Sequence, residues 1–185
     1  MGMDRPPSAD VRHDDRRVDR PRPDGLLPCA SVCTGANMKC VKEVCEVTCT
    51  GASCACPAGV ASCKLKCSGA GKCTNAVTCV ARESCEIECS NDACTNKLSC
   101  SGAACTISCN GAATCTGEIT CAAGEPCAVT CSGGACHGAI RCNNACRCSV
   151  ECTGGGCKSE VQCRTGCTIT PKGCTTTGTG CDVCP

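Results

Sequence analysis

The clearest pattern along this chain is a five-residue alternation in which two cysteines enclose one aliphatic residue, Cys-x-aliphatic-x-Cys. Six complete copies start 18, 22, 20, 22 and 21 residues apart, and a seventh copy at 167–171, CTITP, lacks the second cysteine. Because side chains alternate between the faces of a strand, each copy predicts a strand with both cysteines and the aliphatic residue on one face. The six copies are Cys45–Cys49, Cys63–Cys67, Cys85–Cys89, Cys105–Cys109, Cys127–Cys131 and Cys148–Cys152.

A second and shorter alternation, aliphatic-x-Cys, lies between these copies and ends at Cys79, Cys100, Cys121, Cys142 and Cys163. Apolar residues do not recur at the period of a helix. Each unit of about 20 residues therefore predicts a strand, a corner, a second strand and a second corner. The interior would hold one aliphatic residue from each strand: Leu65 with Val77, Ile87 with Leu98, Ile107 with Ile119, Val129 with Ile140, and Val150 with Val161.

Self-similarity at this period is typical of stacked repeat folds, in which each unit contacts only its neighbours. We therefore predict an all-β fold, a cysteine-stapled parallel β-solenoid of about six or seven coils of about 20 residues, spanning residues 29–185. Small polar residues followed by glycine mark most first corners, and Asn91, which tolerates left-handed geometry, stands in the copy without glycine. Segments Cys29–Cys40 and Thr175–Pro185 depart from the repeat, and we expect them to cap its ends.

The strand assignment restricts the possible disulfide pairs. The two cysteines of one Cys-x-aliphatic-x-Cys strand lie roughly 13 Å apart in extended chain, and a bridge needs Cα atoms within about 7 Å. In the coil that starts at Cys85, we expect Cys89 to pair with Cys94 across the first corner. Cys100 would pair across the second corner, either with Cys85 or with Cys105 of the next coil.

The outward positions of neighbouring coils carry opposite charges in the register that the repeat implies. Adjacent opposite charges on a sheet face contribute a few tenths to about 1 kcal/mol, so these pairs support the register more than the stability. The expected neighbours are Lys64 and Lys66 with Glu86 and Glu88, Lys97 with Glu118, and Arg141 with Glu160.

Composition explains why the repeat needs its cysteines. The chain has no Phe, Tyr or Trp, and only four Leu, five Ile and thirteen Val among 185 residues. Large side chains supply most of the burial energy of an ordinary core, which this inventory cannot build. The 32 cysteines, if fully paired, could replace that core. Disulfides persist in oxidising compartments, so we expect an extracellular or cell-surface location.

Residues 1–28 differ from the rest, with no cysteine, six Arg, six Asp and five of the nine prolines. Because the opposite charges balance, no basic patch arises, and we interpret the segment as a disordered tail rather than a nucleic-acid-binding arm. It has neither the apolar run nor the cleavage site of a signal peptide. No stretch of the chain is long and apolar enough for a membrane-spanning helix, so we expect no membrane insertion.

A solenoid of short coils closed by cysteines resembles the insect β-helical antifreeze proteins, at the level of architecture and over residues 45–170. That resemblance implies ice binding through a flat ladder of Thr-x-Thr pairs. Here only the outward pairs Thr106/Ser108 and Thr168/Thr170 approach such a pattern, and the coil is longer than in that family. Ice binding is therefore the second alternative function, because a shared fold does not transfer a function.

Metal storage is the first alternative, because reduced thiolates bind zinc and copper(I) strongly. Metallothionein-like chains favour Cys-x-Cys and Cys-Cys clusters. Here most successive cysteines are separated by the length of a predicted strand or corner, and no two cysteines are adjacent. We therefore predict no metal-binding residues. The closest spacings are Cys54/Cys56, Cys146/Cys148 and Cys181/Cys184.

We also predict no catalytic or cofactor-binding residues. The Cys-x-x-Cys of a thiol-redox enzyme should open a helix, but Cys184 is followed only by Pro185. His137 occupies a repeat position that holds Thr or Lys in other copies, which favours a solvent-facing residue over a catalytic base. The array lacks the Gly-Gly-x-Gly-x-Asp calcium pattern, and it lacks the basic stripe and aromatic residues of nucleic-acid-binding proteins.

These observations together predict a function without enzymatic activity. We expect a secreted or surface protein, monomeric and rigid, that serves as a structural spacer or a binding scaffold. Its partner would be an unidentified surface or extracellular molecule and not a nucleic acid.

Overall fold

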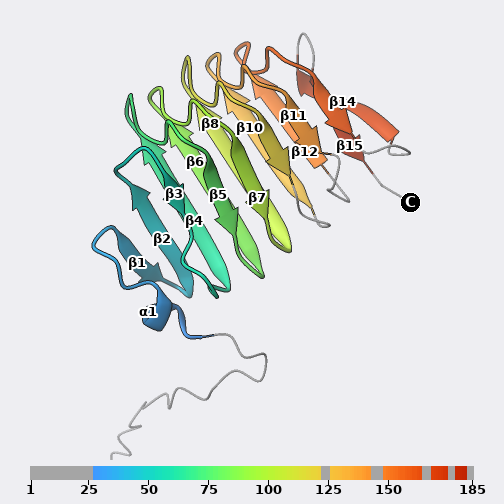
Figure 1. Cartoon of the computed structure of the whole chain (residues 1–185). Coiled ribbons are helices and arrows are strands. Elements are labelled where there is room, and N and C mark those ends of the chain that lie inside the picture. The colour runs from blue at the N-terminus through green and yellow to red at the C-terminus, as the bar shows by residue number, and fades with distance from the viewer. Residues whose placement is uncertain (1–26, 122–125, 143–147, 164–167, 175–177, 183–185) are drawn as a thin grey trace, which may run out of the picture.

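The computed structural model describes residues 27–121, 126–142, 148–163, 168–174 and 178–182. The predicted tail at 1–28 lies outside this part of the chain except for its last two residues, and so do parts of the predicted C-terminal cap, 175–177 and 183–185. The described residues form two sheets whose strands follow one another along a single stack, from β1 to β14 (Figure 1). The predicted all-β, disulfide-rich parallel β-solenoid is confirmed.

The first sheet contains the Cys-x-aliphatic-x-Cys strands, and the second contains the shorter aliphatic-x-Cys strands. The strands of the first sheet, in spatial order, are β1 (Met38–Val41), β2 (Val44–Cys49), β4 (Ser62–Ser68), β6 (Ser84–Ser90), β8 (Ala104–Asn110), β10 (Cys127–Ser132), β12 (Cys148–Thr153), β15 (Gly178–Asp182) and β14 (Thr168–Cys174). The strands of the second sheet are β13 (Val161–Cys163), β11 (Ile140–Cys142), β9 (Ile119–Cys121), β7 (Leu98–Ser101), β5 (Val77–Val80) and β3 (Cys54–Ala55).

Like residues lie on like residues from coil to coil. Strands β4, β6 and β8 pair in parallel so that Leu65, Ile87 and Ile107 form one row, with cysteine rows on both sides of it. In the second sheet, Leu98 lies between Val77 and Ile119 in the same way. A parallel stack with this register repeats each residue's environment in the next coil, which explains why the alternation recurs along the chain.

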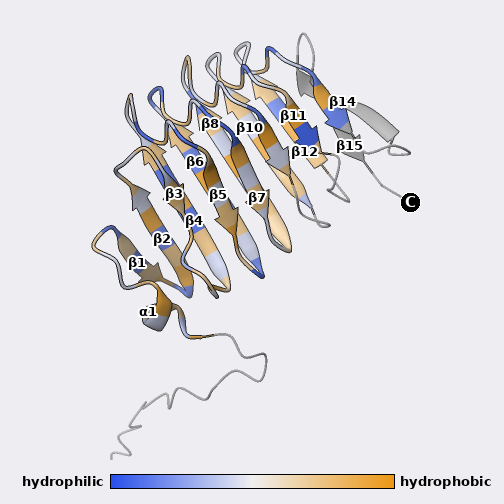
Figure 2. Cartoon of the chain, viewed as in Figure 1, coloured by the Kyte–Doolittle hydropathy of each residue, from blue (hydrophilic) through white to orange (hydrophobic). Residues whose placement is uncertain are grey.

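The core between the two sheets is narrow. It consists of one aliphatic side chain per strand with cysteines beside it, and these aliphatic residues are nearly all completely buried. Figure 2 shows hydrophobic colours along the strands, with hydrophilic colours at corners and at single positions within strands. Burial of one such aliphatic side chain stabilises by about 1.5–3 kcal/mol, so the contribution per coil is small compared with that in a domain with an aromatic core.

The first corners bend through left-handed backbone, in part as the sequence predicts. Gly69, Gly111 and Asn91 have φ values of 101°, 103° and 54°. Four corner cysteines also have left-handed φ values, between 51° and 59°, which the sequence analysis did not anticipate: Cys73, Cys94, Cys115 and Cys136. The amide of each donates a hydrogen bond to a carbonyl of the preceding coil. Coil stacking and the disulfide therefore hold a conformation that costs about 1–2 kcal/mol for a residue with a Cβ.

Antiparallel strands lie at the two ends of the first sheet. At the N-terminal end, the helix α1 (Cys29–Val32) leads into β1, which pairs antiparallel with β2 through a two-residue turn at Lys42 and Glu43. Both turn residues have positive φ, 49° and 66°, as a type I′ hairpin requires. This arrangement agrees with the expectation that Cys29–Cys40 departs from the repeat and caps one end.

The seventh copy of the repeat does not form another parallel coil. Its residues 168–171 lie in β14, which pairs antiparallel with β15, and β15 in turn lies antiparallel to β12. Cys167 lies outside the described residues. The copy has Pro171 where the others have their second cysteine, and the pairing shifts register between Pro171 and Cys174. Proline cannot donate a ladder hydrogen bond, so it is tolerated at a sheet edge, where β14 lies.

Close backbone contact between coils at the first corner requires glycine at position 138. A Cβ at Gly138 would lie 2.1 Å from the carbonyl oxygen of Gly117 in the preceding coil. That oxygen belongs to the backbone, so no side-chain rotation can relieve the clash. A Cβ at Gly51, by contrast, would meet no atom within 4 Å.

We expect Gly138→Ala to separate the coils locally and to reduce stability by about 1–3 kcal/mol, as overpacking does. The measurement is NMR-detected hydrogen exchange of the Cys136 and His137 amides, which bond to carbonyls of the preceding coil. Gly51→Ala is the matched control and should leave the exchange rates unchanged. Equal protection in Gly138→Ala and the wild type would contradict the predicted clash.

Candidate functional site

A row of disulfides closes the first corner of each coil from β2 to β12. Each joins the last cysteine of a first-sheet strand to a cysteine five or six residues later, with Cα atoms 5.6–6.3 Å apart. We call this row the first ladder. Its members are Cys49–Cys54, Cys67–Cys73, Cys89–Cys94, Cys109–Cys115, Cys131–Cys136 and Cys152–Cys157.

A second ladder closes the opposite corner and links each coil to the next. It joins a cysteine at or just beyond a second-sheet strand to the first cysteine of the following first-sheet strand. At the N-terminal end no second-sheet strand among the described residues precedes β2, and its first cysteine, Cys45, pairs instead with Cys33, which follows α1. A separate bridge, Cys29–Cys40, joins α1 to β1. The other members are Cys56–Cys63, Cys79–Cys85, Cys100–Cys105, Cys121–Cys127 and Cys142–Cys148.

The ladders confirm one predicted disulfide pair and decide between the two alternatives for another. Cys89 pairs with Cys94, as expected. Of the two partners left open for Cys100, the structure has Cys105 of the next coil, because Cys85 pairs backward with Cys79. None of the described bridges joins the two cysteines of one Cys-x-aliphatic-x-Cys strand. Every described second-corner bridge therefore links successive coils covalently.

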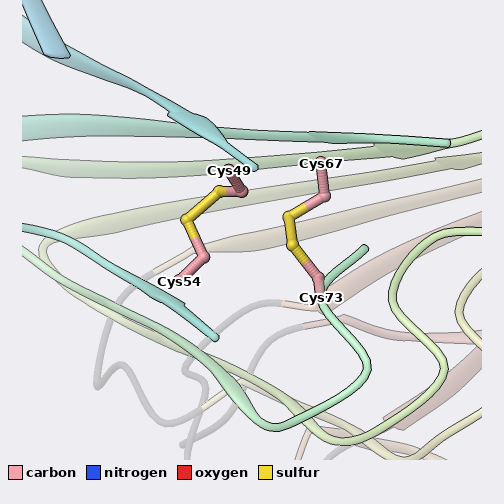
Figure 3. A group of neighbouring side chains, drawn as sticks. All are labelled: Cys49, Cys54, Cys67 and Cys73. Carbon is pink, nitrogen blue, oxygen red and sulfur yellow. A yellow bond between two sulfur atoms is a disulfide. The ribbon is translucent and has the colours of Figure 1, made fainter. Parts of the chain in front are cut away.

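Stacking brings the sulfur atoms of neighbouring bridges together. In the first ladder, the four Sγ atoms of Cys49, Cys54, Cys67 and Cys73 all lie within 4.8 Å of one another. Figure 3 shows these two disulfides side by side, each spanning the same corner in consecutive coils. Three further groups among the described residues bring three sulfurs within the same distance: Cys56/Cys79/Cys85, Cys67/Cys89/Cys94 and Cys121/Cys142/Cys148. Such groups could hold a soft metal ion only if their bridges were reduced, because the thiolate is the metal ligand.

Ligand spacing along the sequence does not reveal these groups, because each group combines cysteines from different coils. Cys54 and Cys56 form separate bridges at opposite corners, so this Cys-x-Cys pair does not chelate as a unit. Cys148 pairs with Cys142, and Cys146 lies outside the described residues. The repeat period of about 20 residues is the signal that could have found the groups, because it superposes equivalent cysteines.

A small cavity lies at the N-terminal end of the stack. Its volume is about 270 Å³, and it is lined by the loop at 35–38, the end of β2 and the first corner. Cys49 and Cys54, the outermost bridge of the first ladder, are among the lining residues. In the second sheet, β3 is the edge strand and has no strand on its N-terminal side. The first bridge of the first ladder therefore borders this cavity. Among the other described bridges, Cys40 and Cys56 are only partly buried.

His137 is held by the corner in which it lies. Its Nε2 hydrogen-bonds the carbonyl oxygen of Gly134 at 2.8 Å, so this nitrogen carries the proton. The adjacent Cys136 is bonded to Cys131 and offers no thiol. Of the C-terminal Cys-x-x-Cys pair, Cys181 lies in β15 and Cys184 lies outside the described residues.

The outward face of the first sheet carries ion pairs between coils. Lys64 places Nζ 2.9 Å from Glu86 and 2.5 Å from Glu88. Lys66 is paired in register with Glu88, as predicted, but its ammonium group turns to Glu46 of the preceding coil at 2.9 Å. Burial of Lys64 lowers its pKa, but the hydrogen bonds to Glu88 and Glu86 outweigh that effect and raise the pKa overall.

On the second sheet, Glu118 lies between two cations. Its carboxylate pairs with Lys97 at 3.0 Å, as predicted, and also with Arg141 of the following coil. The predicted partner of Arg141, Glu160, is wrong by two positions, because Arg141 lies in register with Gln162 and bonds to it. Hydrogen bonds from Lys97 and Arg141 lower the pKa of Glu118 to about 2.

The low pKa of Glu118 predicts a pH dependence at its site. A carboxylate whose pKa is lowered on folding contributes stability above its unfolded pKa, near 4.5, and that contribution is lost as the pH falls toward about 2. We expect Arg141→Gln to raise the pKa of Glu118 toward its ordinary value, as measured by carbon-detected NMR titration of the carboxyl group. Lys39→Gln, which removes a distant cation, is the control. A wild-type pKa near 4.5 would contradict the geometry.

Among the described residues, no helix combines the length and apolar character that a membrane crossing requires. No protein-family model, curated protein or solved structure matches this chain. The resemblance to known solenoids therefore rests on architecture alone, namely parallel coils closed by disulfides.

Proposed function

We propose that this protein is a secreted or cell-surface scaffold without enzymatic activity, whose role is structural or binding. The observation that carries the proposal is the pair of disulfide ladders, which close both corners of successive coils. Such bridges persist only in oxidising surroundings, and this supports an extracellular or surface location. The proposed partner is an extracellular or surface molecule, and the proposed state is a monomer.

Rigidity follows from how the ladders complement the narrow core. A bridge that closes a loop of six residues stabilises by about 2 kcal/mol in the chain-entropy account. That contribution is comparable with the burial of one aliphatic side chain, and each coil has two bridges. The bridges also prevent the described corners from opening, so a protease would meet no loose corner among them that is long enough to enter its active site. These properties suit a spacer or a platform exposed to an extracellular environment.

The absence of enzymatic activity is proposed from the state of the polar groups. In the part of the chain that the structure describes, every buried side-chain nitrogen or oxygen has a hydrogen-bond partner. Buried Thr114, for example, donates to the carbonyl of Asn110 and accepts from the amide of Asp92. The charged residues of the outer faces pair with one another rather than converging on a cleft. This arrangement supports a structural use of the polar residues.

The later coils of the first sheet offer a surface for a partner. The outward side chains at the centres of β8 and β10 are small and uncharged, in contrast to the Lys and Glu pairs of β4 and β6: Thr106, Ser108, Ala128 and Thr130. In the next strand, β12, the outward pair is Ser149 and the charged Glu151. A surface of this kind suits a flat, neutral partner. Ice binding, however, would need regular Thr pairs, and along the parallel first-sheet strands only Thr106/Ser108 approaches one.

Metal storage is the second candidate function, because the described residues include four groups of cysteine sulfurs that lie within 4.8 Å of one another. In that case the chain would carry reduced thiols in its natural state and would bind several zinc or copper(I) ions. The two candidates thus differ in the redox state of the cysteines, which can be measured directly.

We expect the natively produced protein to show no alkylation without prior reduction and 32 alkyl additions after full reduction, as measured by intact mass spectrometry. A fully oxidised chain leaves no thiolate for the reagent. Alkylation of a denatured but unreduced sample is the control against thiols that are merely buried. Many free thiols together with bound zinc or copper would overturn the scaffold function and support metal storage.

A further inference from the structure

We propose that the first two bridges of the first ladder, Cys49–Cys54 and Cys67–Cys73, form a latent metal site. When both bridges are reduced, their four thiolates bind one soft divalent cation of the zinc or cadmium type. This site goes beyond the scaffold function, and it does not depend on metal storage, because the other bridges stay oxidised.

The geometry of the four sulfurs carries the proposal. In a tetrahedral Cys₄ site the metal–sulfur bonds are about 2.3 Å long, which places the sulfurs about 3.8 Å from one another. Here all four Sγ atoms already lie within 4.8 Å of one another. Once the two S–S bonds are broken, bonded sulfurs move apart and non-bonded sulfurs move together by amounts that side-chain rotation can supply. Figure 3 shows the two bridges side by side, with Cys49–Cys54 next to Cys67–Cys73.

The surroundings favour a bound cation over free thiolates. All four cysteines are buried, with Cys67 and Cys73 at 1% and 0% exposure. An unpaired thiolate in such a place is costly, and a divalent cation removes that cost by direct coordination. Among the described residues this is the one group that provides four sulfurs, since the other three groups provide three each. A set of four closes a structural site without needing water as a ligand.

Reduction can begin at this end of the ladder. The cavity of about 270 Å³ reaches Cys49 and Cys54, which are 5% and 8% exposed. The second bridge is more deeply buried, but the new thiolates lie within 4.8 Å of it and can attack it by thiol–disulfide exchange. The Cys33–Cys45 and Cys56–Cys63 bridges hold the same strands, β2 and β4, at their other ends. We therefore expect the local backbone to keep its register while the two bridges open.

The chemistry balances with a water-soluble phosphine as the reductant. Each phosphine gives two electrons to one S–S bond, which breaks, and the phosphorus takes an oxygen atom from water to become a phosphine oxide. The two protons of that water end on the two thiols. Two bridges thus consume two phosphines and two waters and yield four thiols. Binding of one Cd²⁺ by four thiolates then releases four protons to solvent.

The test uses the oxidised full-length protein and Cd²⁺ as the probe. The protein is treated with increasing phosphine without oxygen, freed of excess reagent, and mixed with Cd²⁺. We expect a four-thiol species that carries one Cd²⁺ per chain in native mass spectrometry and shows cadmium–thiolate ultraviolet absorption. Alkylation and peptide mapping should modify Cys49, Cys54, Cys67 and Cys73 without Cd²⁺ and spare them with it. First thiols that map elsewhere, or alkylation that Cd²⁺ does not prevent, would overturn the site.

A matched pair of variants separates this site from general thiol binding. Replacing Cys49 and Cys54 together by Ser should abolish the single bound Cd²⁺ after the same treatment. Replacing Cys131 and Cys136 together by Ser removes a first-ladder bridge of equal spacing outside the described sulfur groups and should leave binding unchanged. Equal Cd²⁺ binding by both variants would refute the assignment. If the first variant does not fold, the protection pattern of the wild-type chain decides.

Discussion

In the described part of the solenoid, a disulfide crosses each corner between the two sheets, because the space between them is only one aliphatic side chain deep per strand. Leu65 or Ile87 removes too little surface from water to hold a coil in place alone. The bridge limits the freedom of the unfolded corner and, at the second corner, joins one coil to the next. The aromatic-free composition imposes this dependence on cross-links, and the left-handed corner cysteines and the short loops accompany it.

Parallel stacking in register is the second constraint, and it acts on every row of the molecule. A residue that suits one coil has its counterpart directly above it, so cysteines meet cysteines and aliphatic residues meet aliphatic residues. Where equivalent positions carry charge, the rows alternate in sign, as at Lys64 between Glu46 and Glu86. Variation is tolerated at outward positions, and there the chain can acquire a neutral or a charged surface without altering its interior.

The stacking that stabilises the oxidised protein also places the sulfur atoms of neighbouring bridges close enough together to bind a metal ion after reduction. Bridges in consecutive coils lie about one strand spacing apart, near 4.8 Å, which is close to the sulfur separation within a zinc–thiolate site. Oxidised, these cysteines are cross-links with no affinity for metal. Reduced in pairs, those at the N-terminal end become a ligand set. The redox state of the surroundings therefore decides which of the two properties the ladder expresses.

The sequence by itself determined the strands, the inward and outward faces, the parallel repeat and the pairing of Cys89 with Cys94, because these depend on local alternation and short loops. The tertiary structure decided between Cys85 and Cys105 as the partner of Cys100, since both were close along the chain. In the tertiary structure, Arg141 forms its ion pair with Glu118 rather than with the predicted Glu160. The seventh copy forms part of an antiparallel hairpin rather than another parallel coil. The convergence of Cys49, Cys54, Cys67 and Cys73 likewise appears only in three dimensions, because stacking joins residues that the sequence separates by a whole coil.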